Sequence, residues 1–168
     1  MKKRSPEERF FEEAVLLLSR KKKTVTFAES CTGGLLAAAL TEAPGASEVF
    51  RGSLVTYAEA VKHQYLGVTE ETLKDHGVVS APCAMEMAKG ARAAMGADIA
   101  LSVTGVAGPG GGTEKTPVGL IFIGVSTPRG TRAYRFLFCK GGKNIRRINR
   151  QAALSAAGLL LLSAARSL

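Results

Sequence analysis

The chain contains no tryptophan, two histidines and three cysteines among its 168 residues. The cysteines, Cys31, Cys83 and Cys139, include no closely spaced pair, and their odd number argues against a disulfide framework. Reduced thiols of this kind are typical of the cytoplasm, which is the expected location. No group of histidine, cysteine and acidic residues has the spacing of metal ligands, so we expect chemistry without a metal ion or other cofactor.

Long apolar runs are also missing. The longest, residues 152–165, is interrupted by Ser155, Gly158 and Ser163 and falls short of the roughly 20 residues that span a bilayer. The N-terminus is basic and then acidic rather than apolar, which does not fit a secretory signal. We expect no membrane segment and a single domain over residues 1–168, because this length and 46% apolar content suit one hydrophobic core.

Acidic residues are few, with 14 against 23 lysines and arginines, and the net charge is +9. Much of the positive charge lies in residues 21–23 and 140–150, where solvated helix ends would account for it. Such a charge suits polyanions or phosphate-bearing small molecules. No nucleic-acid reader motif or interleaved aromatic residues accompany it, so nucleic acid is not the expected partner.

Hydrophobic periodicity and turn residues predict alternating strands and helices. Ser5-Pro6-Glu7-Glu8 has the pattern of a helix start with Ser5 as N-cap, and it opens an N-terminal helix within residues 1–23. Strands are expected at residues 24–28, 53–57, 98–103, 118–126 and 132–138, and the last two should form a hairpin. Further helices are expected within residues 29–40, around Lys62, after the N-caps Thr69 and Ser80, and over residues 143–168. This order predicts an α/β fold, a three-layer α/β/α sandwich with a mixed sheet.

Ser30 lies in the predicted turn between the first strand and the next helix. Such a turn lies at the carboxyl edge of the sheet, where the amides of Thr32, Gly33 and Gly34 would suit a phosphate or an oxyanion. The alternative is that Ser30 or Thr32 only caps the helix. Two successive glycines early in a helix cost stability unless close approach requires them, which slightly favours a ligand site.

A serine nucleophile needs a base to take its proton. His63 lies beside Lys62, and His76 precedes Gly77 at a helix end, where a capping or solvated role is typical. A lysine can replace histidine when burial lowers its pKa, which makes Lys62 a candidate. Most helical lysines are surface charges, so spacing alone does not select this one.

A glycine-rich loop over residues 104–113 follows a buried strand and therefore lies where ligands bind α/β sheets. Its candidate ligand contacts are Gly105, Gly108 and Gly112. The loop lacks the Gly-Lys-Ser/Thr ending of a P-loop and opens no helix, which argues against nucleoside triphosphate hydrolysis. The alternative is a mobile connector.

Four segments carry a specific pattern: Ala-Glu-Ser-Cys-Thr-Gly-Gly-Leu-Leu at 28–36, the stretch 55–68, the stretch 77–92, and 97–109 ending in Ser-Val-Thr-Gly-Val-Ala-Gly-Pro. Together they resemble the CinA C-terminal family, which is known for nicotinamide mononucleotide deamidase activity. The resemblance implies a catalytic pair of Ser30 and Lys62, with Tyr57 and Thr104 lining the same site.

The reaction that the resemblance implies is hydrolysis of the carboxamide of nicotinamide mononucleotide (NMN) to nicotinate mononucleotide and ammonia, a step of pyridine nucleotide salvage. Ser30 would attack the amide carbon while Lys62 takes and returns the proton. Tyr57 would stack on the ring or donate a hydrogen bond, and Thr104 would orient the carboxamide. Arg146 and the glycine loop are the candidates for the 5′-phosphate.

The chain departs from the family pattern in two places. Gly141 and Gly142 stand where the aspartate and arginine of a Gly-Asp-Arg stretch are usual, and Thr116 precedes Pro-Val-Gly where a lysine is usual. Lys115 and Lys143 are the candidates to compensate. The departures leave open a catalytically weak or inactive family member that binds a nucleotide or a protein.

The resemblance also bears on the chain's architecture and assembly. Full-length family proteins carry an N-terminal domain with no counterpart here, so we expect the stand-alone form. The Ala/Leu-rich last helix is a candidate surface for a homodimer.

Overall fold

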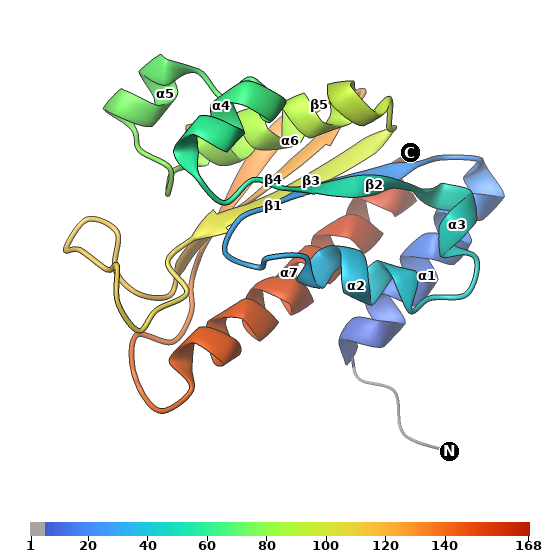
Figure 1. Ribbon diagram of the computed structural model, residues 1–168. Coiled ribbons are helices and arrows are strands. Elements are labelled where there is room, and N and C mark those ends of the chain that lie inside the picture. The colour runs from blue at the N-terminus through green and yellow to red at the C-terminus, as the bar shows by residue number, and fades with distance from the viewer. Residues whose placement is uncertain (1–5) are drawn as a thin grey trace.

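In the computed structural model, which describes residues 6–168, a five-stranded sheet lies between two layers of helices (Figure 1). The strands are β1 (Val25–Glu29), β2 (Phe50–Val55), β3 (Ile99–Gly105), β4 (Leu120–Thr127) and β5 (Gly130–Leu137), in the order β2-β1-β3-β4-β5. β1 pairs in parallel with β2 and β3, whereas β4 pairs antiparallel with β3 and β5. The predicted α/β sandwich with a mixed sheet is confirmed.

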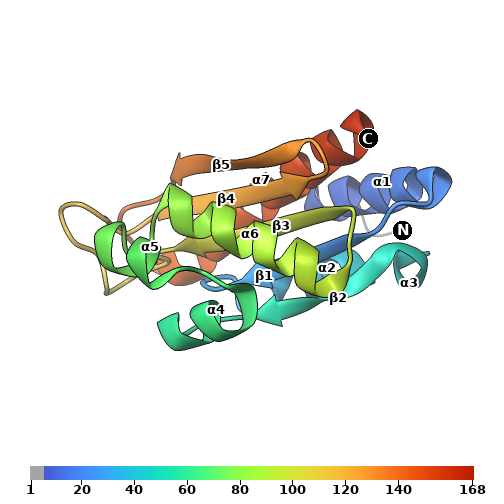
Figure 2. The ribbon, with the colours of Figure 1, turned by 90° about the horizontal axis from the view of Figure 1, so that it is seen from above.

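Helices cover both faces of the sheet. One face carries α1 (Pro6–Lys21), α2 (Leu35–Thr41) and α7 (Ile145–Ser167), with the single turn α3 (Ala46–Val49) beside α1. The other face carries α6 (Ala81–Met95), on which α4 (Glu59–Leu66) and α5 (Glu70–Asp75) pack. Seen from above, β2 and β5 form the two edges of the sheet (Figure 2).

Local signals in the sequence locate most of these elements. The hydroxyl of Thr69 accepts the amide of Thr72, and that of Ser80 accepts the amide of Cys83, so both predicted N-caps are confirmed. The predicted cap Ser5 lies outside the described residues. The one-turn helix α3 was not predicted, because four residues are too few to show a helical period.

How deeply each strand is buried depends on its position in the sheet. Every residue of β1 is buried, as expected for a central strand covered by helices on both faces. Along β5, exposed positions outnumber partly buried ones, because this strand lies at the edge of the sheet.

Helix α7 packs most of its apolar side chains against α1 and the sheet. Ala153, Ala157 and Leu161 are fully buried in the core that α7 shares with α1 and the sheet. Ile148 and Leu159 remain exposed on α7, and the homodimer contact expected at this helix stays a prediction. Among residues 6–168, no helix has the length and apolar character needed to cross a membrane.

Candidate active site

Three chain segments meet where the parallel strands end. The Ser30 amide donates to the Val103 carbonyl, and the Thr56 amide donates to the Glu29 carbonyl, both at 2.9 Å. The parallel pairing of β1 with β2 and β3 therefore continues one residue past the end of β1. It places Ser30 between Thr56 on one side and Thr104 on the other, at the carboxyl edge where α/β proteins bind ligands.

Lys62 reaches Ser30 from α4, on the opposite face of the sheet from α2. Its Nζ lies 3.1 Å from Ser30 Oγ, 2.7 Å from the Thr56 carbonyl and 3.0 Å from the Tyr57 carbonyl. The lysine is 1% exposed and the serine 8%. Burial lowers the pKa of the Lys62 amine, and the weaker influence of Cys83, Cys31 and Glu59 opposes this shift.

The three neighbours of Nζ are oxygens, which match the three N–H donors of an ammonium and equally the two donors and one lone pair of a neutral amine. Such an amine has two N–H donors and one lone pair, and the two carbonyls can only accept. With both donors directed at Thr56 and Tyr57, the lone pair is left for the Ser30 hydroxyl proton. The arrangement can thus activate Ser30 as a nucleophile, with Lys62 as the base.

The carboxylate of Glu29, fully buried, caps helix α2. Its Oε2 accepts the amides of Gly34 and Leu36 at 2.9 and 3.1 Å, and its Oε1 accepts the amide of Ala37 and the hydroxyl of Ser53 at 3.0 and 3.1 Å. An acidic group is favoured at a helix N-terminus because it meets unpaired N–H groups and the positive end of the helix dipole. Glu29 therefore fixes the turn that carries Ser30.

This cap changes the roles predicted for the turn. Neither Ser30 nor Thr32 caps α2 through its side chain, because Glu29 does so. The Gly34 amide donates to Glu29 and the Gly33 amide to the Ser30 carbonyl, so neither is free for a ligand. Both glycines have positive φ, 56° and 97°, which explains their presence in the turn. The amides of Cys31 and Thr32 have no hydrogen-bond acceptor on another residue within residues 6–168 and remain the available donors of the turn.

Tyr57 and Arg146 border the site on its solvent side. Tyr57 is 62% exposed, and its hydroxyl accepts a hydrogen bond of 3.0 Å from Arg146 Nη2. Arg146 Nη1 also donates to the Gly108 carbonyl at 3.1 Å. The predicted residues Tyr57, Arg146 and Gly108 are thus brought together, from the β2–α4 connection, α7 and the glycine loop.

Thr104 is buried, and its hydroxyl donates to the Val78 carbonyl at 2.6 Å. Its oxygen can therefore still accept a hydrogen bond but has no second proton to give. Gly105 and Gly112 have packing reasons to be glycine. A Cβ would lie 2.6 Å from the Leu120 carbonyl at the first position and 2.8 Å from the Val118 amide at the second.

Asn149, fully buried on α7, joins the two loops beside the site. Its Oδ1 accepts the amide of Cys139, and its Nδ2 donates to the carbonyls of Cys139 and Ala107, all at 3.0 Å. Arg150, the next residue, donates from Nη2 to the Thr32 carbonyl at 2.7 Å. Helix α7 is therefore bonded to the glycine loop, to the segment before α7 and to the Ser30 turn.

The remaining reactive side chains do not form a competing centre. Burial raises the pKa of Cys31 to about 11 and that of Cys83 to about 11, so both are neutral thiols near pH 7. His63 Nδ1 contacts the Val68 carbonyl at 2.8 Å, and His76 ends α5, so neither histidine meets Ser30. In the described part of the chain, no three His, Cys, Asp or Glu side chains gather as metal ligands.

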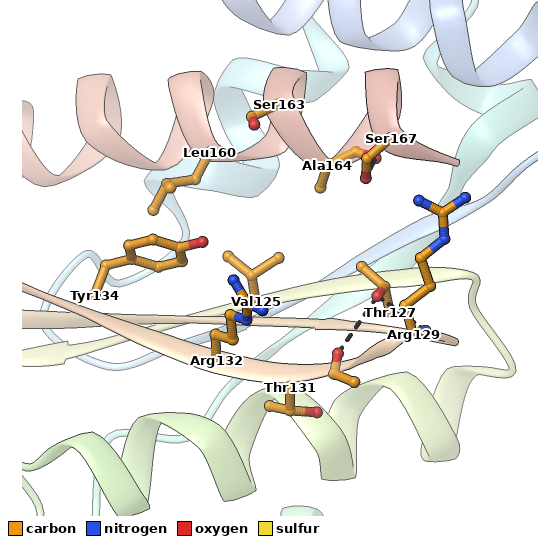
Figure 3. A pocket seen from close by; sticks show the side chains of 11 residues that line it. Val125, Thr127, Arg129, Thr131, Arg132, Tyr134, Leu160, Ser163, Ala164 and Ser167 are labelled. Carbon is orange, nitrogen blue, oxygen red and sulfur yellow. Dashed lines mark hydrogen bonds between the residues drawn. The ribbon is translucent and has the colours of Figure 1, made fainter.

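A cavity of about 430 Å³ lies elsewhere, between the β4–β5 hairpin and the end of α7 (Figure 3). Its lining combines arginines, hydroxyls and small apolar side chains, among them Arg129, Arg132, Tyr134, Leu160 and Ser163. Because β4 runs antiparallel to β3, the hairpin lies at the end of the sheet opposite to Ser30. This cavity is therefore separate from the serine–lysine pair.

The sequence pattern described as the CinA C-terminal domain matches residues 7–161. The chain belongs to the CinA C-terminal domain family. Among its relatives, the CinA-like protein of Endomicrobium trichonymphae is 50% identical over 131 residues, which are 78% of this chain and 31% of that protein. The CinA-like protein of Thermotoga maritima is 50% identical over 119 residues, 71% of this chain and 29% of the relative. The chain thus spans about a third of the length of these relatives.

Solved structures of the CinA superfamily share the fold. The competence/damage inducible protein CihA from Agrobacterium tumefaciens has a TM-score of 0.90 and 36% identity, over 95% of this chain and 96% of the other. A CinA superfamily protein from Klebsiella pneumoniae has a TM-score of 0.88 and 30% identity, over 96% and 99% of the two chains. The family resemblance drawn from the four sequence segments is thereby confirmed.

The two departures from the CinA pattern lie in loops, where Gly141 and Gly142 are exposed and Thr116 is half-buried. Gly141 and Gly142 lie in the segment between β5 and α7, and Gly142 has a φ of 114°. Lys143, in the same segment, and Lys115, two residues after the glycine loop, are exposed, and no hydrogen bond or ion pair joins either to a described residue. Neither departure touches the Ser30 and Lys62 side chains.

Sequence reasoning missed three residues that position this CinA site: Glu29, Asn149 and Arg150. Glu29 directly precedes Ser30 and could have been suspected, because an acidic residue ahead of a helix start is a capping signal. Asn149 and Arg150 act on backbone groups far away in sequence, such as Thr32, which is 118 residues from Arg150. No local sequence pattern predicts contacts between residues so far apart in the chain.

Proposed function

We propose that the chain is a nicotinamide-nucleotide amidohydrolase that converts NMN to nicotinate mononucleotide and ammonia. The observation that carries the proposal is the contact between Ser30 and Lys62, two buried side chains at the ligand-binding edge of the sheet. Within the described residues, the hydrogen-bond partners of the buried Lys62 amine are neutral oxygens and none is a carboxylate, and such surroundings favour the uncharged amine that a general base needs. The substrate is the one implied by the family resemblance.

In the first step, Ser30 Oγ attacks the carboxamide carbon while the Lys62 amine takes the hydroxyl proton. A carbon–oxygen bond forms, and the negative charge moves to the amide oxygen. The carbon–nitrogen bond then breaks, Lys62 returns the proton, and ammonia leaves an ester on Ser30. In the second step, water attacks that ester with Lys62 again as base, which releases the carboxylate and restores Ser30.

Other residues of the site have supporting roles in this proposal. The amides of Cys31 and Thr32 are the donors of the turn that remain for the developing oxyanion. The Thr104 oxygen can accept a hydrogen bond from the carboxamide nitrogen, because its own proton is held by the Val78 carbonyl. The exposed Tyr57 ring offers a face for the pyridinium, whose positive charge is attracted to aromatic rings. Arg146, on the same rim, is a cation for the phosphate.

The experiment is ammonia release from NMN by purified wild type, Ser30→Ala and Lys62→Met, without added metal. We expect activity in the wild type and a fall of at least about a hundredfold in each variant. Ser47→Ala and Lys74→Met, which change exposed side chains on α3 and α5, are the matched controls and should retain activity. Full activity in folded Ser30→Ala would contradict the proposed chemistry.

A second candidate is a CinA domain that binds the nucleotide without turning it over. The glycines at 141 and 142 favour it, because they remove a charged pair that is usual before the last helix. It predicts that calorimetry detects NMN binding to the folded wild type while no ammonia is released. Release of ammonia that depends on Ser30 would exclude it.

A further inference from the structure

Two arginines on α7 face the site without a carboxylate partner. Arg146 and Arg150 are four residues apart, so they lie one above the other on the same side of the helix. Both guanidinium groups donate to neutral acceptors: Arg146 to the Gly108 carbonyl and the Tyr57 hydroxyl, and Arg150 to the Thr32 carbonyl. No described Asp or Glu forms an ion pair with either arginine.

Arg150 is the less satisfied of the two. A guanidinium carries five N–H donors, and here one hydrogen bond, from Nη2 to Thr32, is formed within residues 6–168. Its Nε is buried without a partner, and so is the Oγ1 of Thr32, the residue that it contacts. A partly buried charge with unused donors and no counter-ion is unfavourable. An anion bound beside the guanidinium would supply a counter-charge and accept hydrogen bonds from its unused Nη donors.

The position of Arg150 relates it to the nucleophile. Thr32 lies two residues after Ser30 in the same turn, and the Arg150 guanidinium approaches to 3.5 Å the place where a Cβ on Gly33 would be. At Cys31, in the middle of this turn, burial raises the thiol pKa, and the charges of Arg150, Arg146 and Lys62 oppose the rise. Three cations therefore surround the Ser30 turn.

We propose that Arg150 binds the phosphate group of the substrate together with Arg146, and so selects phosphorylated nucleotides over the corresponding nucleosides. A phosphomonoester dianion has three oxygens that accept charge-assisted hydrogen bonds, and two guanidinium groups one helical turn apart can share them. The inference rests on the proposed function, since it assigns the anionic part of the same substrate. The reacting carboxamide stays with Ser30 and Lys62.

The alternative role for Arg150 is to hold the Thr32 carbonyl and thereby the shape of the turn. The two roles differ in their substrate dependence. A phosphate contact affects only substrates that carry the phosphate, whereas a distorted Ser30 turn slows every amide substrate alike. Nicotinamide riboside, which has the same ring, carboxamide and ribose but no phosphate, separates them.

The test compares kcat/KM for NMN and nicotinamide riboside in wild type, Arg150→Met, Arg150→Lys and Arg147→Met. Arg147 is exposed on the same turn of α7, so Arg147→Met removes an equal charge without touching the site. We expect Arg150→Met to lower the preference for NMN by about ten- to a hundredfold, chiefly through KM. Arg150→Lys should keep part of the preference, and Arg147→Met all of it.

An equal loss on both substrates in Arg150→Met, or no loss on either, would overturn the proposal. If the wild type hydrolyses neither substrate, the proposed function fails while the anion site is still tested. Calorimetry with ribose 5-phosphate then serves as the probe. Binding that weakens in Arg150→Met and not in Arg147→Met supports the site, and equal binding in all variants refutes it.

Discussion

Replacing Glu29 by glutamine should destabilise the fold strongly, although the change adds no volume and removes one formal charge. The carboxylate is fully buried and accepts four hydrogen bonds, two on each oxygen. Glutamine keeps one oxygen, which can still accept two of them. Its NH2 group would face the amide of Ala37, and two donors cannot bond to each other. The hydroxyl of Ser53 can rotate and accept instead.

The magnitude follows from this count. One buried N–H group is left without an acceptor, at a cost of about 1–3 kcal/mol. The two or three surviving bonds change from charged to neutral acceptors and lose about 1 kcal/mol each. The expected loss of unfolding free energy for Glu29→Gln is therefore about 3–6 kcal/mol. That is a large part of the 5–15 kcal/mol typical of a whole domain.

Urea denaturation followed by circular dichroism measures this loss. Glu48→Gln is the matched control, because Glu48 is an exposed carboxylate on neighbouring α3 that accepts one hydrogen bond, from Ser19. It should change stability by less than about 0.5 kcal/mol. A loss below about 1 kcal/mol in Glu29→Gln, with an unchanged denaturant slope, would show that the carboxylate does not hold the turn as described.

Three further outcomes follow from the same structure. Because the pKa of Lys62 is lowered in the fold, kcat/KM for NMN should rise with pH through an ionisation that lies below the usual lysine value. The free energy of unfolding should also rise with pH between that lowered pKa and the unfolded value near 10.4, because in this window the unfolded chain binds one proton more than the folded chain. A pH series on wild type and Lys62→Met tests both, and a stability rise that survives in the variant would exclude Lys62 as its source. For Asp98, burial alone raises the pKa, but hydrogen bonds from Lys23 and Thr24 outweigh it and leave the pKa lowered. Its stabilising contribution is therefore present above about pH 4 and lost as pH falls through the lowered pKa, so the difference in Tm between wild type and Asp98→Asn should shrink toward pH 3; a constant difference would argue against it. Asn149→Ala should cost about 2–4 kcal/mol in urea unfolding, because it leaves backbone groups of Cys139 and Ala107 unpaired; a change under about 1 kcal/mol would mean that the loops do not depend on this side chain.

Much of the fold could be predicted from local patterns. Buried strands such as residues 98–103 are short apolar runs between turn signals, and Thr69 and Ser80 carry their capping chemistry in the sequence itself. The turn after β1 was placed for the same reason. The role of Glu29 as the cap of α2 was not predicted, because the register of the strands determines that its side chain points at the start of that helix.

The site was predicted in part, and the limits have physical reasons. Ser30 follows from its place in a strand–turn–helix unit, but Lys62 is one of many lysines, and only the family resemblance selected it. The burial that lowers its pKa comes from packing between α4 and the sheet edge, which no helical period reveals. Arg150 was not predicted as a site residue, because its contact with Thr32 depends on how α7 lies across the sheet.

The central claim is that Ser30 forms an ester with the substrate while Lys62 moves the proton. The most direct measurement is peptide mass spectrometry of enzyme quenched in acid during turnover of NMN. The account predicts a nicotinate-nucleotide ester on Ser30 in the wild type and none in Ser30→Ala. Steady ammonia release by the wild type with no adduct on Ser30 at any time, matched by an active Ser30→Ala, would contradict it.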